Sequence, residues 1–404
     1  MKSNFGKWFW VLSLGVLFLF SSAGAAFAEK EVVIGWIPHL TGMYGPATRG
    51  IHEGVMDVIE AVNTMEPING IKLKAVWADG ASSPAKAVSA LKKMVGQHNP
   101  VIVIGLTTPS ALASKGYLMK KKIPALEAGG ADPLWMLPSW SFSMQAPYVN
   151  QLGGWIDFYL KNIWPKKGLN RKPNFAWVTW DNAAGRASIT DAAKAYIKSK
   201  GVNLLPSEFF PVAPTETGAQ VMRLKKNEVD FTYGMLLFPT AAAILKGLGK
   251  MGMIDRIDLA MSIPNPPDVV KQVGGLTRNV YASDYWWPPD EWAKKSPQTL
   301  ALYKKKGRKV PKFLFGAGLG YGLIAAQAVR MAAQDVGANN VNGEACYNAL
   351  KKMKNYERWN VGVPIGFGEK KRFGCDQTML YRLNNNKVNA AGMMPLPNLT
   401  KFKF

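Results

Sequence analysis

Short apolar runs alternate with amphipathic segments along nearly the whole chain. The runs are rich in β-branched residues, as in 101–104, and such continuous runs are typical of strands covered on both faces. Between them, apolar residues recur at helical spacing, as at Ile51, Val55 and Val58. This alternation predicts an α/β fold of parallel sheets with helices on both faces. The predicted strands are 32–36, 71–77, 101–104, 123–126, 175–180, 230–233 and 259–263.

The alternation comes in two blocks, separated by segment 138–150, which contains several aromatic residues and two prolines. A chain of 404 residues is longer than a single core usually supports, so we expect two lobes. Segment 138–150 is the predicted first crossing between them. Near the C-terminus, the apolar run 380–383, three asparagines and Val388 predict a terminal hairpin.

The first 28 residues do not follow this pattern. Lys2 and Lys7 precede the apolar run 8–20, and small residues follow, ending in Ala26-Phe27-Ala28. This order predicts a secretory signal peptide over 1–28, and therefore a periplasmic protein. The run is short for a bilayer span, which takes about 20 apolar residues, although an uncleaved anchor is the alternative. No cysteine follows the run, which argues against a lipoprotein.

The chain is strongly basic, with a formal net charge of +23. Its lysines are scattered, and the densest runs are only Lys120-Lys121-Lys122 and Lys304-Lys305-Lys306. No zinc-finger, basic-zipper or RNA-binding aromatic signature accompanies them. We therefore expect a solvated basic surface and no nucleic-acid partner, with a weak attraction for anionic ligands left open.

Few residues of the chain suit catalysis. Three histidines and two cysteines lack metal-ligand spacing, and no Gly-x-Ser-x-Gly turn is present. The glycine-rich segment 316–322 leads into an apolar helix without a preceding strand, which favours close helix packing over phosphate binding. We predict no enzyme activity, no cofactor and no metal. In an oxidising compartment Cys346 and Cys375 predict one disulfide, and two buried free thiols are the alternative.

Several motifs in order resemble the branched-chain amino-acid-binding proteins, the type I periplasmic components of ABC importers. The similarity spans nearly all of the chain after the signal peptide. The motifs are Ile34-Gly35-Trp36-Ile37-Pro38-His39-Leu40-Thr41-Gly42, Tyr44-Gly45, Asn69-Gly70-Ile71, Ile104-Gly105, Gly129-Gly130-Ala131-Asp132-Pro133 and Asp230-Phe231-Thr232-Tyr233.

The resemblance implies two doubly wound lobes joined by three crossings, with ligand bound in the cleft between them and released to a membrane permease. We expect a monomer. The implied lobes are 29–148 with 283–357, and 149–282 with 358–404. Since open α/β sheets bind ligands beyond the carboxyl ends of their strands, the cleft should be lined by specific loops. These follow Trp36, Ile104, Leu126, Trp180, Leu236 and Ile263.

The resemblance also implies that hydroxyls and backbone N–H groups after Ile104 hold a ligand carboxylate. Here that loop contains Thr107, Thr108 and Ser110, and a helix N-terminus there would favour an anion. Ser110 as a simple helix cap is the alternative. Pro109 removes one N–H donor from the loop.

The expected partners of a ligand ammonium are missing. The family places Thr near Ala131 and an acid in the loop after Ile263, but 261–265 contains no acid. A buried ammonium without a carboxylate is costly. Glu127, Asp132, Asp181 and Asp284 are possible substitutes, although none matches the family by position.

The cleft-facing segments are instead aromatic and apolar, which favours a small carboxylate with an aromatic or branched aliphatic body. Interlobe packing is the alternative role for the Trp286–Trp287 pair. An amino-acid binder of the same family and a sensor not coupled to transport remain the competing functions. The predicted ligand-binding residues are Tyr44, Thr107, Thr108, Ser110, Gly129, Gly130, Ala131, Trp180, Asp181, Leu237, Phe238, Asn265, Tyr285 and Trp286.

Overall fold

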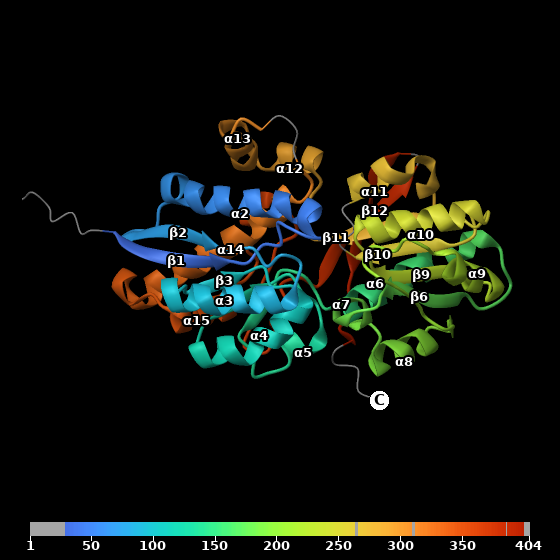
Figure 1. The fold of residues 1–404 in the computed structure, drawn as a ribbon, viewed down its shortest axis with the longest axis horizontal. Coiled ribbons are helices and arrows are strands. Elements are labelled where there is room, and N and C mark those ends of the chain that lie inside the picture. The colour runs from blue at the N-terminus through green and yellow to red at the C-terminus, as the bar shows by residue number, and fades with distance from the viewer. Residues whose placement is uncertain (1–28, 263–265, 309–311, 385, 400–404) are drawn as a thin grey trace, which may run out of the picture.

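The computed structural model describes residues 29–262, 266–308, 312–384 and 386–399. They form two α/β lobes that lie side by side (Figure 1). The predicted signal peptide and Asn265 lie outside the described residues. Among the described residues, no helix is both long enough and apolar enough to span a bilayer.

The first lobe is built on a parallel five-stranded sheet of order β2-β1-β3-β4-β5. Alternate residues of its strands face opposite sides: Ile102 and Ile104 contact the core under α2 and α14, whereas Val103 packs with α3 and α4. Its strands are β1 (Lys30–Trp36), β2 (Ile71–Trp77), β3 (Ile102–Ile104), β4 (Ala125–Glu127) and β5 (Ser141–Ser143). Its helices are α2 (Gly45–Met65), α3 (Pro84–His98), α4 (Thr108–Lys121), α5 (Asp132–Trp135), α12 (Pro289–Lys295), α13 (Pro297–Lys305), α14 (Phe315–Val336) and α15 (Gly343–Lys352).

The second lobe has a mixed sheet of order β13-β12-β11-β10-β9-β6-β7, with β8 paired to β6. The predicted terminal hairpin is confirmed, because β12 and β13 are antiparallel and join the sheet beside β11. Its strands are β6 (Asn174–Trp180), β7 (Asn203–Leu204), β8 (Glu208–Phe210), β9 (Phe231–Met235), β10 (Asp258–Ser262), β11 (Val280–Asp284), β12 (Gln377–Asn384) and β13 (Lys387–Pro395). Its helices are α6 (Tyr148–Asn162), α7 (Ala183–Arg186), α8 (Asp191–Ser199), α9 (Gly218–Lys226), α10 (Phe238–Lys250) and α11 (Pro266–Val273).

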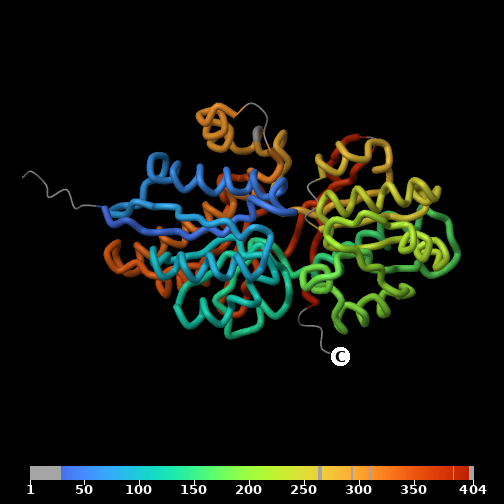
Figure 2. The backbone as a smooth tube through the Cα atoms, in the orientation of Figure 1, coloured from blue at the N-terminus to red at the C-terminus, as the bar shows by residue number. Residues whose placement is uncertain are grey.

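The chain passes between the lobes at three places, which run through the middle of the molecule (Figure 2). They lie between β5 and α6, after β11, and before β12. The predicted third boundary at 357/358 is too early: Phe373 still forms a parallel bridge with Ser143 of β5. The strand–helix alternation stops before this segment, so no local pattern marks the third crossing.

The prediction of a disulfide is wrong, because both cysteines are free and buried. The Cys375 thiol donates to the Met144 carbonyl at 3.1 Å, and Cys346 lies inside the core on α15. Burial raises the pKa of both thiols to about 12, which keeps them protonated. The compartment decides whether a disulfide is allowed, but only the fold decides which cysteines are within reach.

The glycine-rich segment 316–322 lies within α14 and packs closely on α2, as predicted. A Cβ added at Gly318 would stand 2.1 Å from the Ile51 carbonyl oxygen, and one at Gly322 would stand 2.2 Å from a Val58 methyl group. These glycines let the two helix backbones approach each other. The segment is therefore part of the helix packing of the first lobe.

Candidate functional site

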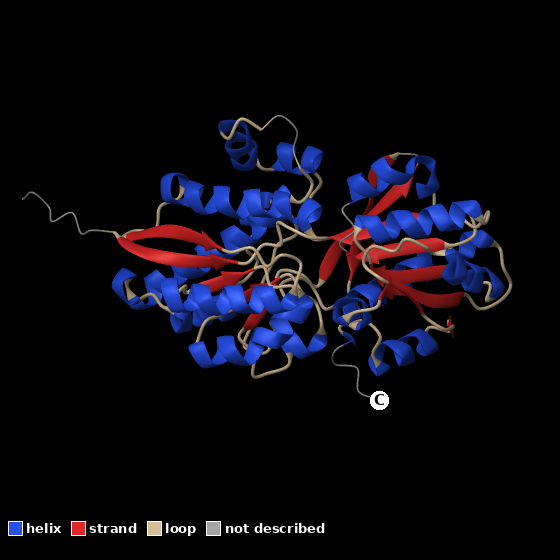
Figure 3. Ribbon diagram, in the orientation of Figure 1, coloured by secondary structure: helices blue, strands red, loops and turns tan. Residues whose placement is uncertain are grey.

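The loops at the carboxyl ends of both sheets gather between the lobes (Figure 3). Tyr44 precedes α2, and its ring lies 6.3 Å from the ring of Trp180 at the end of β6. The two residues belong to different lobes, so this contact joins the facing loops of the two lobes. On its other side Tyr44 packs edge-on against His39 at 5.8 Å. Tyr44 and Trp180 thus form one aromatic wall of the candidate site.

The predicted hydroxyl loop stands at the start of α4. Thr107 occupies the N-cap position without a side-chain cap bond, and its hydroxyl lies 3.0 Å from the Ser110 hydroxyl. Ser110 is therefore not the cap residue of the helix, which removes the simpler interpretation of this serine. Thr108 and Ser110 are both buried, and the Thr108 Oγ1 atom has no hydrogen-bond partner in the described residues.

Gly129 and Gly130 lie directly against this loop. A Cβ at Gly129 would stand 2.7 Å from Thr108 Oγ1, and a Cβ at Gly130 would stand 2.6 Å from the Tyr148 ring. A side chain at either position would displace these groups, so glycine is required by close approach. Ala131 is buried beside them and precedes α5.

Tyr148, which the sequence analysis did not select, lies at the centre of this group. Its backbone N–H donates to the Gly130 carbonyl at 3.0 Å, and its hydroxyl lies beside the Thr108 hydroxyl and the Gly130 backbone. Burial raises the pKa of Tyr148 well above its ordinary value, so the phenol stays a neutral donor. It begins α6 at the predicted first crossing, and its position there was the only available signal.

The second lobe contributes its aromatic wall mainly through two loops. Trp180 is buried, and its indole N–H donates to the Thr240 hydroxyl at 2.7 Å. Leu237 is the N-cap residue of α10 and Phe238 is its first residue, and both remain partly exposed while packing against buried apolar side chains. Asp181, in contrast, is exposed and pairs with Arg186 at 2.7 Å. The Asp181 carboxylate thus already has the Arg186 guanidinium as its partner at the surface.

Tyr285 and Trp286 lie deeper, where the three crossings run together. Both are buried, and the Trp286 carbonyl accepts from the Tyr381 hydroxyl at 3.1 Å. The Trp286 ring packs edge-on against Phe313 at 6.5 Å, and the residue forms a bridge with Gly362. These contacts agree with interlobe packing as the role of Trp286.

Of the other acids proposed as ammonium partners, Glu127 and Asp284 are buried and Asp132 is half-buried. Glu127 is fully buried at the end of β4, its carboxylate accepts from Ser141 at 2.9 Å, and burial raises its pKa to about 8. Burial also raises the pKa of Asp284 well above its usual range, and that of Asp132 to about 6. Glu127 therefore holds a proton at neutral pH, and burial favours the protonated form of Asp284 as well, so both carboxyls are poor partners for a cation.

On the second-lobe side of the candidate site, the buried polar groups are neutral side chains rather than ionised acids. The Gln151 side-chain carbonyl accepts from the Ser262 hydroxyl at 2.6 Å, at the end of β10. Gln151 and Ser262 are both buried, and the Tyr233 hydroxyl nearby donates to the Tyr148 carbonyl at 3.4 Å. Within the described part of the chain, no group of three or more His, Cys, Asp or Glu residues could hold a metal ion.

The model of a family described as "Periplasmic binding protein" matches residues 31–388. The chain belongs to the periplasmic binding protein family. This finding confirms the resemblance drawn from the motifs, and the family is one of binding proteins rather than enzymes. The two doubly wound lobes of this periplasmic binding protein agree with that assignment.

Curated relatives of this binding protein carry names of amino-acid binders. It is 27% identical over 220 residues to the Leu/Ile/Val-binding protein homolog 3 of Brucella melitensis, a match that covers 52% of this chain and 55% of the relative. It is 24% identical over 385 residues to the Leu/Ile/Val-binding protein BraC3 of Rhizobium johnstonii, covering 92% and 96% of the two chains. The chain thus spans little more than half of the first relative, but nearly all of the second.

Solved structures share the fold. A branched-chain amino acid ABC transporter protein of Thermus thermophilus with bound valine superposes with a TM-score of 0.81 at 16% identity, over 92% of this chain and 98% of the other. A solute-binding protein of R. palustris in complex with 4-hydroxybenzoate gives a TM-score of 0.73 at 17% identity, over 92% and 99%. At such identities the likeness shows the type I binding-protein fold alone.

Proposed function

We propose that this periplasmic binding protein captures a small organic carboxylate, aromatic or branched aliphatic, between its lobes and delivers it to the permease of an ABC importer. The observation that carries the proposal is the group formed by Thr108 at the start of α4, Gly130 in the loop after β4 and Tyr148 at the start of α6. Hydroxyls and a helix N-terminus there offer donors to an anion, beside the Tyr44–Trp180 wall.

The nearby acids support a ligand without an ammonium group. An ammonium leaving water needs an ionised acid or several acceptors. Burial raises the pKa of Glu127 to about 8 and favours the protonated form of Asp284, and Asp181 pairs with Arg186. The R. palustris protein with 4-hydroxybenzoate is a structural neighbour of the expected kind. Export through a cleaved signal peptide over 1–28 and a monomeric state belong to the same proposal.

The second candidate is an amino-acid binder, which the names of the curated relatives favour. Matched ligand pairs separate the two. L-leucine and 4-methyl-2-oxopentanoate share one carbon skeleton and differ at the amino group, as do L-phenylalanine and phenylpyruvate. The protein should first be unfolded and refolded by dialysis to remove bound solute.

Calorimetry and thermal shift then rank the pairs, with 4-hydroxybenzoate as a further acid. We expect the acids to bind and their amino-acid partners not to bind. Tight binding of leucine without binding of its keto acid would overturn the choice of ligand class. Uptake of the identified ligand by a strain lacking the gene distinguishes import from sensing, because only an importer component changes uptake.

A further inference from the structure

A second polar groove lies at the far end of the second lobe. Its volume is about 1170 Å³, and its floor is formed at the amino ends of β9, β10 and β11. The candidate site between the lobes lies at the carboxyl ends of the same strands. The groove is therefore separated from that site by the full length of these strands. Loops before these strands and the β12–β13 hairpin form its walls.

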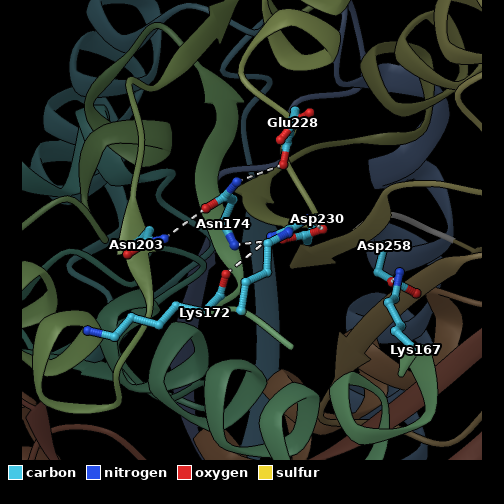
Figure 4. A network of polar contacts seen from close by, with 8 residues as sticks. Lys167, Lys172, Asn174, Asn203, Glu228, Asp230 and Asp258 are labelled. Atoms are coloured by element: carbon cyan, nitrogen blue, oxygen red, sulfur yellow. Dashed lines mark hydrogen bonds and ion pairs between the residues drawn. The ribbon is translucent and has the colours of Figure 1, made fainter. Parts of the chain in front are cut away.

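Two buried carboxylates at the floor already have cationic partners. Arg171 donates to both oxygens of Asp230 at 2.7 and 2.8 Å, and the Asn174 backbone N–H adds a third bond at 2.7 Å. Lys167 pairs with Asp258 at 2.6 Å, where the Asp258 side chain is only 3% exposed. Figure 4 shows Lys167 reaching Asp258 beside the network around Asp230. Both acids are therefore internally neutralised.

Four further cations line the groove without such partners. No ion pair joins Lys166, Lys225, Arg256 or Arg382 to an acid within the described ranges. The remaining acids of the lining are Glu228 and Asp255, and Asp255 pairs with Arg278 at 3.0 Å. The groove thus carries an excess of positive charge that the protein itself leaves uncompensated.

An aromatic ring, that of Tyr281, also lies at the floor of the groove beside these cations. Tyr281 is almost fully buried, and the Arg382 guanidinium lies over its ring at 5.9 Å. Stacking of this kind orients a guanidinium while leaving its N–H donors available to an oxyanion. Several cations spread over one groove favour a multiply charged anion, because a single carboxylate could satisfy only one or two of them.

We propose that this groove, the lobe 2 groove, binds a phosphate-bearing polyanion independently of the ligand in the cleft. Arg256 and Arg382, from the β10 and β12 sides, would hold separate phosphate groups by paired N–H donors. The anion could be a soluble polyphosphate compound or the headgroups of an anionic lipid surface, which share this chemistry.

Titration calorimetry of the full chain with inorganic tripolyphosphate tests the site. The variant Arg256→Ala/Arg382→Ala removes two exposed cations and should lower the affinity at least tenfold. Lys92→Ala/Lys120→Ala is the matched control, since it removes two exposed cations from the first lobe, one of which lies over the Tyr117 ring at 5.8 Å. The control should retain the wild-type affinity.

A parallel arm measures co-sedimentation with phosphatidylglycerol vesicles, with phosphatidylcholine vesicles as the neutral blank. If the groove variant loses binding and the control variant does not, the site is supported. Loss in the tripolyphosphate arm identifies a soluble phosphate compound as the ligand, and loss in the vesicle arm identifies a lipid headgroup. No binding in both arms, or an equal loss in both variants, overturns it. The cleft ligand must bind both variants like wild type, so failure of this proposal is distinguishable from failure of the proposed function.

Discussion

At the residue scale, Tyr148 joins the two features on which the proposed capture of a carboxylate depends. It begins the helix after the first crossing, and its ring closes over Gly130 while its hydroxyl meets the Thr108 side chain. A neutral phenol beside a hydroxyl loop can donate to a carboxylate without a charge of its own, which lowers the cost of burying the anion.

Tyr148→Phe should weaken binding of the cleft ligand about three- to tenfold, because one net hydrogen bond contributes about 1 kcal/mol. The melting temperature of the ligand-free protein should change little. Calorimetry with the best acid from the ligand screen measures the effect. Tyr117→Phe, a partly buried tyrosine on α4 beneath Lys92, is the control and should bind like wild type. Equal affinities of all three proteins would contradict the role of the phenol.

Glu127 predicts a pH dependence of stability. Burial raises its pKa from 4.5 to about 8, so between these values the native state binds more protons than the unfolded state. Stability contributed by the protonated form is present below pH 4.5 and is lost as pH rises toward 8. Glu127→Gln keeps the Ser141 bond and removes the titration.

From pH 5 to pH 8, the free energy of unfolding of the wild type should therefore fall by up to about 4 kcal/mol more than that of Glu127→Gln. Urea unfolding at the two pH values measures this difference. Glu29→Gln, at an exposed position, should behave like wild type. If the free energy of unfolding changes with pH equally in the wild type and in Glu127→Gln, Glu127 is ionised in the folded protein and the prediction is wrong.

At the element scale, the contact between α2 and α14 holds the first lobe together. Both helices lie on one face of its sheet, and their backbones meet at Gly54 of α2 and Gly318 of α14. Glycine usually weakens a helix interior, so the four glycines within residues 316–322 are tolerated because tertiary packing requires them.

Gly318→Ala should destabilise the protein by about 3 kcal/mol, because its Cβ would overlap the Ile51 carbonyl and force the helices apart. Gly116→Ala is the control: it also lies in a helix, α4, but a Cβ there meets nothing within 4 Å. This substitution should be neutral or stabilise by up to about 1 kcal/mol. Urea denaturation followed by circular dichroism compares the two, and equal effects would refute the packing argument.

At the scale of the whole molecule, the three crossings separate two bodies whose facing loops touch through Tyr44 and Trp180. A ligand can favour the closed arrangement only by binding it more tightly than the open one. The buried crossing residues Tyr285 and Trp286 provide a packed pivot for such a movement.

Adding the cleft ligand should therefore lower the radius of gyration in solution scattering and raise the melting temperature together. At a ligand concentration 100-fold above the dissociation constant, the stabilisation should be about 2.7 kcal/mol. Tripolyphosphate, which we assign to the lobe 2 groove, should leave the radius of gyration unchanged. A ligand that stabilises the protein without compaction would argue against hinge closure.

The sequence by itself determined the local elements and their order, since hydrophobic periodicity and strand–helix alternation depend on neighbouring residues. It also placed Tyr44, Thr108, Gly130 and Trp180 at strand ends, where parallel sheets collect their loops. Strand β5 was hidden inside the predicted first crossing, because its three residues carry too little pattern.

Only the tertiary structure decided which distant residues meet. It brought Tyr148 to the hydroxyl loop, enclosed Glu127, kept the two cysteines apart as free thiols and moved the third crossing to the residues after Phe373. It also gathered cations from separate helices, loops and strands into the lobe 2 groove. The burial of a side chain, the distance between two side chains and the net charge of a groove depend on residues far apart in the chain. Local sequence patterns therefore cannot predict them.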